Sequence, residues 1–153
     1  MAPAATKPEP IHLTFRDANT PVLVEAENED RFFTTVREAA AACQAADKEA
    51  QFSKQLRDNL FTKLRNWLRK QTSKVEGAYL AIREGGLLFL VVRSDTPYDR
   101  QFEDDLTALD AEIATDPSLS LVALDVMALP HVSEETAMAF LGSKKTLAVF
   151  TRA

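Results

Sequence analysis

A run of six apolar residues, Leu87 to Val92, limits more than any other feature how this chain can fold. The pair Gly85-Gly86 precedes it and another apolar stretch, 78–83, lies before the pair, which is typical of a β-hairpin with a tight turn. The run is far too short to cross a bilayer. Because it is apolar at odd and even positions alike, we expect a central strand with both faces buried. The sequence therefore predicts a β-sheet covered by helices.

Two strands and two helices are predicted before this hairpin. Apolar and polar residues alternate over 11–16, and the stretch 22–26 is largely apolar, so these segments indicate two strands joined by a turn. Apolar residues recur at helical spacing over 30–47 and again over 49–72. The apolar stripe changes direction between these two segments, which favours a break near Asp47. One continuous bent helix is the alternative, since neither Gly nor Pro separates them.

Helices and strands alternate after the hairpin. Thr96 as N-cap and Pro97 in the first turn predict a helix start, and Asp116-Pro117 predicts its end. Ser133 is a second candidate N-cap, and Gly142 a second helix end. The elements predicted here are a helix over 98–115, a strand over 119–129, a helix from 133 to 142 and a strand over 147–150.

The predicted order, ββααββαβαβ, indicates an α+β fold in which helices cover a mixed β-sheet. We expect a single domain over 11–153, preceded by a disordered Pro/Ala-rich tail over 1–10. The strand 87–92, the helix after it and the strand 119–128 are long enough for a right-handed parallel crossover. The alternative is a ferredoxin-like split βαββαβ core, in which the last of these strands does not lie beside the first.

Composition and motifs narrow the function classes without identifying one. The chain has 153 residues, 46% of them hydrophobic and 27% charged, which is ordinary for a folded domain. Its one cysteine, Cys43, excludes an internal disulfide, and no phosphate-binding glycine motif, GxSxG or HExxH occurs. His12 and His131 are too far apart in the sequence to indicate a local metal pair. We therefore expect neither cofactor nor metal. Without an apolar export signal, the expected compartment is the cytoplasm.

Charge is distributed unevenly along a chain whose formal net charge is −5. Residues 51–74 hold seven Lys and Arg against one acid, a balance of +6, whereas residues 98–116 hold seven acids against one Arg, a balance of −6. These two segments could meet within one chain or between two copies. Such pairing favours orientation and association rate more than affinity.

The basic amphipathic helix, 49–74, is the main candidate site. We expect it to dock another protein or a second copy of this chain, which would make the protein a binding or assembly module and not an enzyme. The alternative is a nucleic-acid-associated protein whose same cations contact phosphates, a role that the acidic net charge disfavours. A purely structural explanation is that these cations surround the protein's own core. The candidate partner-binding residues are Lys54, Arg57, Lys63, Arg65, Arg69, Lys70 and Lys74.

A third hypothesis is a small enzyme with a site at one edge of the sheet. If the strands 87–92 and 119–128 are parallel, Asp95 and His131 follow them at the same edge, where open α/β sheets commonly bind ligands. Asp125 interrupts an apolar strand, and a carboxylate there needs a partner, for which Arg83 and Arg93 are candidates. The structural explanation is that Asp95 is a turn residue and that Asp125 forms an ion pair.

Overall fold

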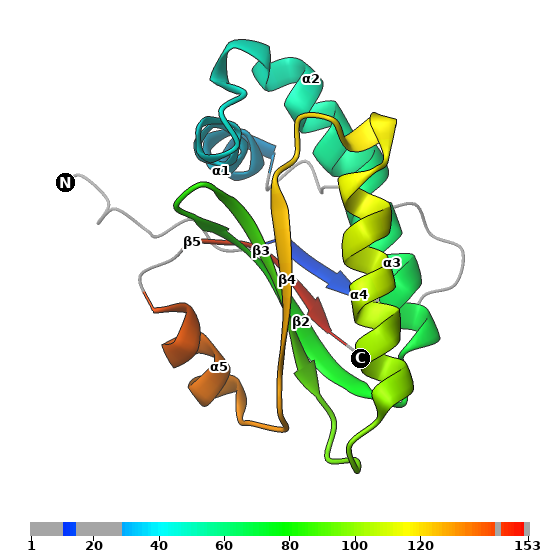
Figure 1. Ribbon diagram of the computed structural model, residues 1–153. Coiled ribbons are helices and arrows are strands. Elements are labelled where there is room, and N and C mark those ends of the chain that lie inside the picture. Colours follow the sequence, from blue (N-terminus) through cyan, green and yellow to red (C-terminus); the bar gives the residue numbers. More distant parts are fainter. Residues whose placement is uncertain (1–10, 15–28, 143–144, 152–153) are drawn as a thin grey trace, which may run out of the picture.

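A five-stranded mixed sheet forms the centre of the molecule (Figure 1). The computed structural model describes residues 11–14, 29–142 and 145–151, so the predicted tail and the predicted strand 22–26 lie outside the described residues. The strands follow the order β1-β5-β2-β3-β4 across the sheet. Their bounds are β1 Ile11–Thr14, β2 Val75–Arg83, β3 Gly86–Arg93, β4 Leu124–Leu129 and β5 Lys145–Thr151.

The strand pairing confirms the parallel crossover. β2 is antiparallel to β3 and to β5, whereas β1 is parallel to β5 and β4 is parallel to β3. The ferredoxin-like alternative is wrong, because β4 lies directly beside β3, with Leu87 opposite Leu124 and Val92 opposite Leu129. The described residues form a single α+β domain, as the sequence predicted.

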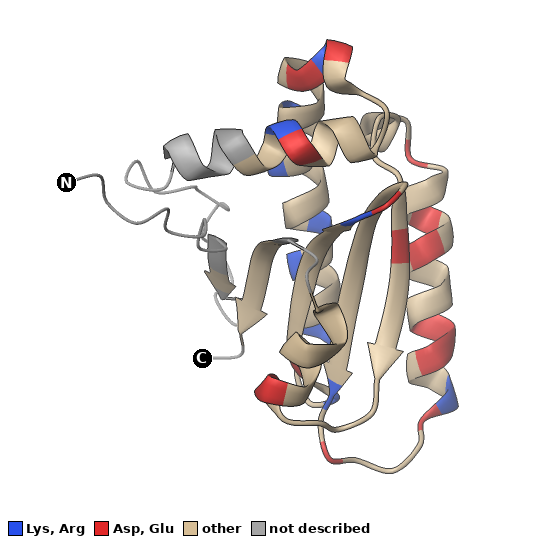
Figure 2. Cartoon of the chain, turned by 90° about the vertical axis from the view of Figure 1, so that its left-hand side faces the viewer, with Lys and Arg blue, Asp and Glu red and all other residues tan. Residues whose placement is uncertain are grey.

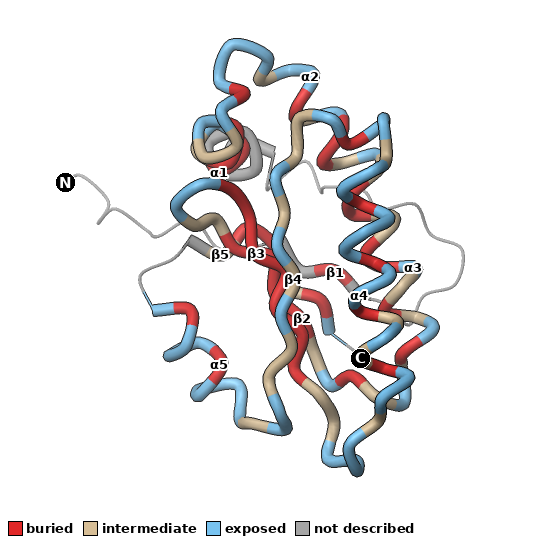
Figure 3. The backbone as a smooth tube through the Cα atoms, viewed as in Figure 1, coloured by how far each residue is buried: buried red, intermediate tan, exposed pale blue. Residues whose placement is uncertain are grey.

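The helices cover the two faces of the sheet unequally (Figures 1 and 3). The larger core joins one face of the sheet to the first four helices, whereas α5 packs on the opposite face over a smaller cluster that includes Tyr79, Leu90 and Ala137. β2 and β3 are buried along most of their length, but β4 is only partly buried or exposed (Figure 3). The helices are α1 Glu29–Ala42, α2 Glu49–Lys54, α3 Phe61–Lys70, α4 Arg100–Ala114 and α5 Glu134–Leu141.

The predicted break between the first two helices is confirmed. Gln44 has a positive φ of 59° directly after α1, and a short 3₁₀ turn, Ala46–Lys48, leads into α2. From Glu49 to Lys70 the backbone stays helical, but the stretch Gln55–Leu60 is π-helical. Gln55 is buried there, and its amide bonds a distant loop, donating to Ser120 Oγ at 3.2 Å and accepting from Leu121 N at 2.9 Å.

Two predicted boundaries on either side of α4 are wrong. Asp99, and not Thr96, is the N-cap, since its Oδ1 accepts hydrogen bonds from Gln101 N at 2.9 Å and Phe102 N at 3.3 Å. Pro97 lies in the preceding loop. β4 begins at Leu124 rather than at residue 119, because a 3₁₀ turn over Pro117–Leu119, capped by Asp116, occupies the start of the predicted strand.

Candidate functional site

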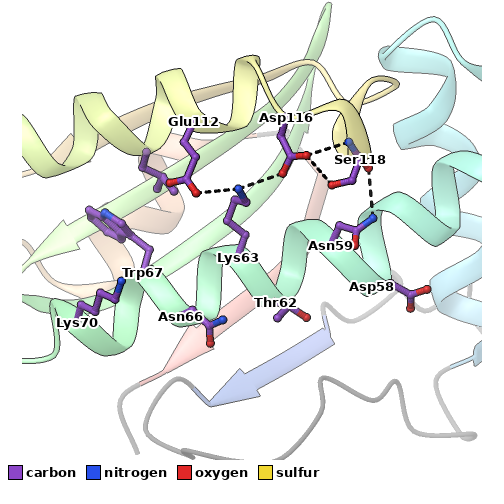
Figure 4. Close-up of a pocket in the computed structure, with 11 residues that line it drawn as sticks. Asp58, Asn59, Thr62, Lys63, Asn66, Trp67, Lys70, Glu112, Asp116 and Ser118 are labelled. Atoms are coloured by element: carbon purple, nitrogen blue, oxygen red, sulfur yellow. Dashed lines mark hydrogen bonds and ion pairs between the residues drawn. The ribbon is translucent and has the colours of Figure 1, made fainter.

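The basic and acidic segments meet within the chain, along the seam between α3 and α4 (Figure 4). Lys63 Nζ lies 3.0 Å from Glu112 Oε1 and 3.0 Å from Asp116 Oδ2. At the other end of the seam, Lys74 Nζ lies 2.7 Å from Asp99 Oδ2. One of the arrangements expected from the sequence, pairing within a single copy, is therefore present in part.

The ring of Trp67 lies in the middle of this seam. Its Nε1 donates to the backbone oxygen of Asp105 at 3.3 Å. The centroids of the Trp67 and Phe102 rings lie 5.8 Å apart. Gln71 is buried and donates to the Asp105 carboxylate at 2.9 Å. Hydrogen bonds and ring packing thus join the two segments, as in a structural interface, although Gln71 Oε1 is buried without a hydrogen-bond partner among the described residues.

The pKa shifts in the seam follow from these contacts. The pKa of Asp116 falls to about 2, chiefly because the Ser118 hydroxyl and then the Lys63 ammonium bond the carboxylate, with the Ser118 amide adding to the effect. Burial lowers the pKa of Lys63, but hydrogen bonds and charges from Glu112 and Asp116 outweigh it, so that the net pKa is raised. Both ends of the ion pair therefore stay charged at neutral pH.

The structure divides the seven candidate cations into groups. Lys63 and Lys74 are in ion pairs, and Arg65 is buried. Lys54 and Lys70 are exposed and Arg69 is partly buried, and none of these three forms an ion pair with a described residue. Arg57 is also partly buried. The predicted basic surface is thus smaller than the sequence suggested, because part of its charge is used inside the fold.

The predicted site at the sheet edge is assembled from different residues than expected. Asp125 pairs with Arg83, one of its two predicted partners, at the amino-terminal end of β4. His131 follows the opposite end of that strand, so Asp125 belongs to another part of the molecule. Asp95 lies in the loop after β3 and has no contact with His131 among the interactions of the described residues.

His131 pairs instead with Glu76, which the sequence did not single out. Its Nδ1 lies 3.1 Å from Glu76 Oε2, and both side chains are about half exposed (48% and 50%). β2 is antiparallel to β3, so its first residues lie at the edge where β3 and β4 end. The predicted strand began only at residue 78, and extending it backwards by two residues would have placed Glu76 at this edge.

The outer edge of β4 is the third feature that bears on function. β4 is an edge strand of the sheet, and no strand within the described residues pairs with its outer side. In Figure 1 this edge faces the viewer, with α4 on one side of it and α5 on the other. Leu124, Val126 and Ala128 are only partly buried, although they pack against the larger core, and Met127 is 39% exposed. Partly exposed apolar side chains therefore lie along the unpaired backbone edge of β4.

Comparison with protein-family models, with curated proteins and with solved structures gives no match. Within the described part of the chain, no helix has the length and apolar character needed to cross a membrane. The same residues contain no group of three or more His, Cys, Asp or Glu side chains that could hold a metal ion. The function proposed below therefore depends on the geometry alone.

Proposed function

We propose that this protein is a protein-binding module whose docking surface is the outer edge of β4. The backbone of that strand carries the proposal. Leu87 N donates to Ala123 O at 2.8 Å, and in a parallel ladder alternate residues direct both backbone groups toward the same neighbour. Asp125, Met127 and Leu129 therefore bond β3. The residues between them direct one N–H and one C=O each toward the open side: Leu124, Val126 and Ala128.

An extended segment of another protein fits this edge. It would continue the sheet through backbone hydrogen bonds, the mode in which a free sheet edge recognises a strand. Its inward side chains would contact the partly buried apolar residues of β4 beneath α4. Met127 and Asp125 border the edge on the opposite face, since they lie beside Leu90 and Leu88 of the smaller core cluster.

The charges beside this edge favour a basic partner. At 100° per residue, Glu103 and Asp110 project from the flank of α4 opposite to the one that carries Asp105 and Glu112 toward α3. That opposite flank is the one next to the free edge of β4, and Figure 2 shows the acidic residues of α4 alongside the strand. Asp125 adds a carboxylate whose side chain is 61% exposed. An extended segment with Lys or Arg at alternate positions would therefore be attracted.

The same charges disfavour a second copy as the partner. Antiparallel pairing of two β4 edges would place both α4 helices side by side on the same face of the joined sheet. Glu103 and Asp110 of one copy would then oppose the same acids of the other, and like charges brought together at an interface oppose association. The basic helix supplies less support than the sequence suggested, because Lys63 and Lys74 are already in ion pairs.

A peptide library tests this function directly. We expect twelve-residue peptides selected from a random displayed library to carry alternating β-branched and basic residues. On binding, the amide protons of Leu124, Val126 and Ala128 should become protected from exchange, whereas those of Asp125 and Met127 are protected already.

A matched pair of charge reversals on α4 is the control. Asp110→Lys places the new charge beside the proposed groove, and Asp104→Lys places it on the exposed outer surface of the same helix. Asp110→Lys should weaken the selected peptides roughly three- to tenfold, and Asp104→Lys should leave them nearly unchanged. Selection of acidic peptides, or protection confined to other strands and helices, would refute the proposed docking surface.

A further inference from the structure

A hollow of about 430 Å³ lies at the edge of the sheet where β3 and β4 end, on the face that α5 covers. The ends of β2, β3 and β5 form one side of it, and the loop from His131 to Glu134 forms the other. Its apolar walls are Val92, Val132 and Val149. It is separate from the free edge of β4 and from the seam between α3 and α4.

A β-bulge places Glu76 at this hollow. Val75 is opposite Arg93 and Gly77 is opposite the adjacent Val92, so Glu76 is an extra residue in β2. A bulge redirects the side chain that it carries, and bulges are frequent next to functional sites. At this position a carboxylate oxygen of Glu76 lies 3.1 Å from His131 Nδ1.

Tyr79 lines the hollow and carries a hydroxyl group. The residue is only 6% exposed, and its hydroxyl has no hydrogen-bond partner among the described residues. Burial raises the pKa of Tyr79, and the negative charges of Glu134 and Glu76 raise it further. The phenol therefore stays protonated close to two carboxylates. A ligand in the hollow could therefore form a hydrogen bond with this hydroxyl.

We propose that this hollow binds a small organic cation, namely a protonated amine attached to an apolar body. Among the described residues, its lining contains two carboxylates and no Lys or Arg, which favours cations over anions. The carboxylates and the phenol oxygen can accept hydrogen bonds from an ammonium group. The valine walls would contact the apolar body, as is usual in small-molecule sites.

Ser133 and the start of α5 position Glu134 for this role. The Ser133 hydroxyl is already used as the helix cap, since it accepts a hydrogen bond from Thr136 N at 3.1 Å. That cap fixes the direction of the first helical turn, in which Glu134 lines the hollow and the neighbouring Glu135 does not. The site thus contains one glutamate of an adjacent pair, which provides a matched control.

Phenethylamine is a suitable probe, with the anion 3-phenylpropionate as its counterpart of similar shape. We expect saturable binding of phenethylamine in calorimetry and in amide chemical shifts, with the largest shifts at Glu76, Tyr79 and His131. The anion should produce neither. Glu134→Gln and Tyr79→Phe should each weaken phenethylamine about tenfold, the effect of one lost hydrogen bond to a charged group.

Glu135→Gln removes the same charge from the same helical turn and should leave the affinity unchanged. Each variant should keep the unfolding midpoint within the range of the parent protein, so that a loss of binding reports on the site. Equal losses in Glu134→Gln and Glu135→Gln would overturn the proposal, as would equal binding of the anion or no saturable binding of phenethylamine. The result does not depend on β4, because the peptide-edge variants leave this hollow intact.

Discussion

The two glycines of the β2–β3 turn should respond very differently to replacement by alanine. Gly85 has a φ of +85°, and a Cβ added there would meet no atom within 4 Å. Gly86 has a φ of +152°, and a Cβ there would lie 2.5 Å from Ala123 O and 3.1 Å from Ala123 Cβ. The first substitution therefore strains only its own backbone, whereas the second also pushes β4 away from β3.

The difference can be estimated from the contacts. An L-residue in a left-handed conformation costs roughly 1–2 kcal/mol, which is the whole expected effect of Gly85→Ala. At Gly86 the backbone strain is about 1–3 kcal/mol. The displaced Ala123 oxygen also loses the hydrogen bond from Leu87 N, now 2.8 Å long, and such a bond contributes about 1 kcal/mol. Gly86→Ala should therefore lower the free energy of unfolding by about 2–4 kcal/mol.

Urea unfolding followed by far-UV circular dichroism would measure both variants. The slopes should match, so that the midpoints report on stability alone. In a thermal scan, Gly86→Ala should melt about 4–16 °C below the parent protein, since 1 kcal/mol corresponds to about 2–4 °C at this chain length. Equal losses in the two variants would refute the reasoning, because only Gly86 lies against β4.

Three further predictions concern the seam and the core. The pKa of Asp116 is lowered to about 2 in the folded protein. Its carboxylate therefore stabilises the fold at a pH above its pKa in the unfolded chain, ~3.9, and this contribution is lost as the pH falls through about 2. In urea titrations between pH 5 and pH 2, Asp116→Asn should therefore lose less stability than the parent protein. At pH 7, Lys63→Ala should lower the urea midpoint clearly, because two carboxylates lose their cation, whereas Lys70→Ala should leave it nearly unchanged. By the same assay, Phe89→Ala should cost about 3–5 kcal/mol and Met127→Ala less than about 1 kcal/mol, since the first side chain is fully buried and the second is 39% exposed.

Local sequence signals predicted an element correctly where a residue type has one main structural role. Gly85 and Gly86 predicted the hairpin, and the apolar run after them predicted a buried central strand, as found. Ser133 and Gly142 correctly bound the helix between them. The start of α4 was missed because Thr96 and Asp99 are both good caps, and only the tertiary position of the loop decides between them.

Pairing between distant strands could not be read from the pattern. The last strand, β5, inserts between β1 and β2, and alternation of apolar residues shows which face is buried but not which strand is the neighbour. The same limitation hid the Glu76–His131 pair, whose members are brought together by the register of three strands and by a bulge. A bulge adds one residue without any distinctive sequence signal at Glu76.

Opposite charges pair across the seam between α3 and α4, which reduces the charge that remains for a partner. Lys63 and Lys74 form ion pairs with acids of the neighbouring segment, so part of the +6 balance is used within the fold. The acids on the far flank of α4, Glu103 and Asp110, point away from those cations and keep their charge. Together with Asp125, these acids place carboxylates beside the open edge of β4. The basic segment predicted from the sequence is therefore partly used within the fold, and the surface that we propose for docking is an acidic one that would favour a basic partner.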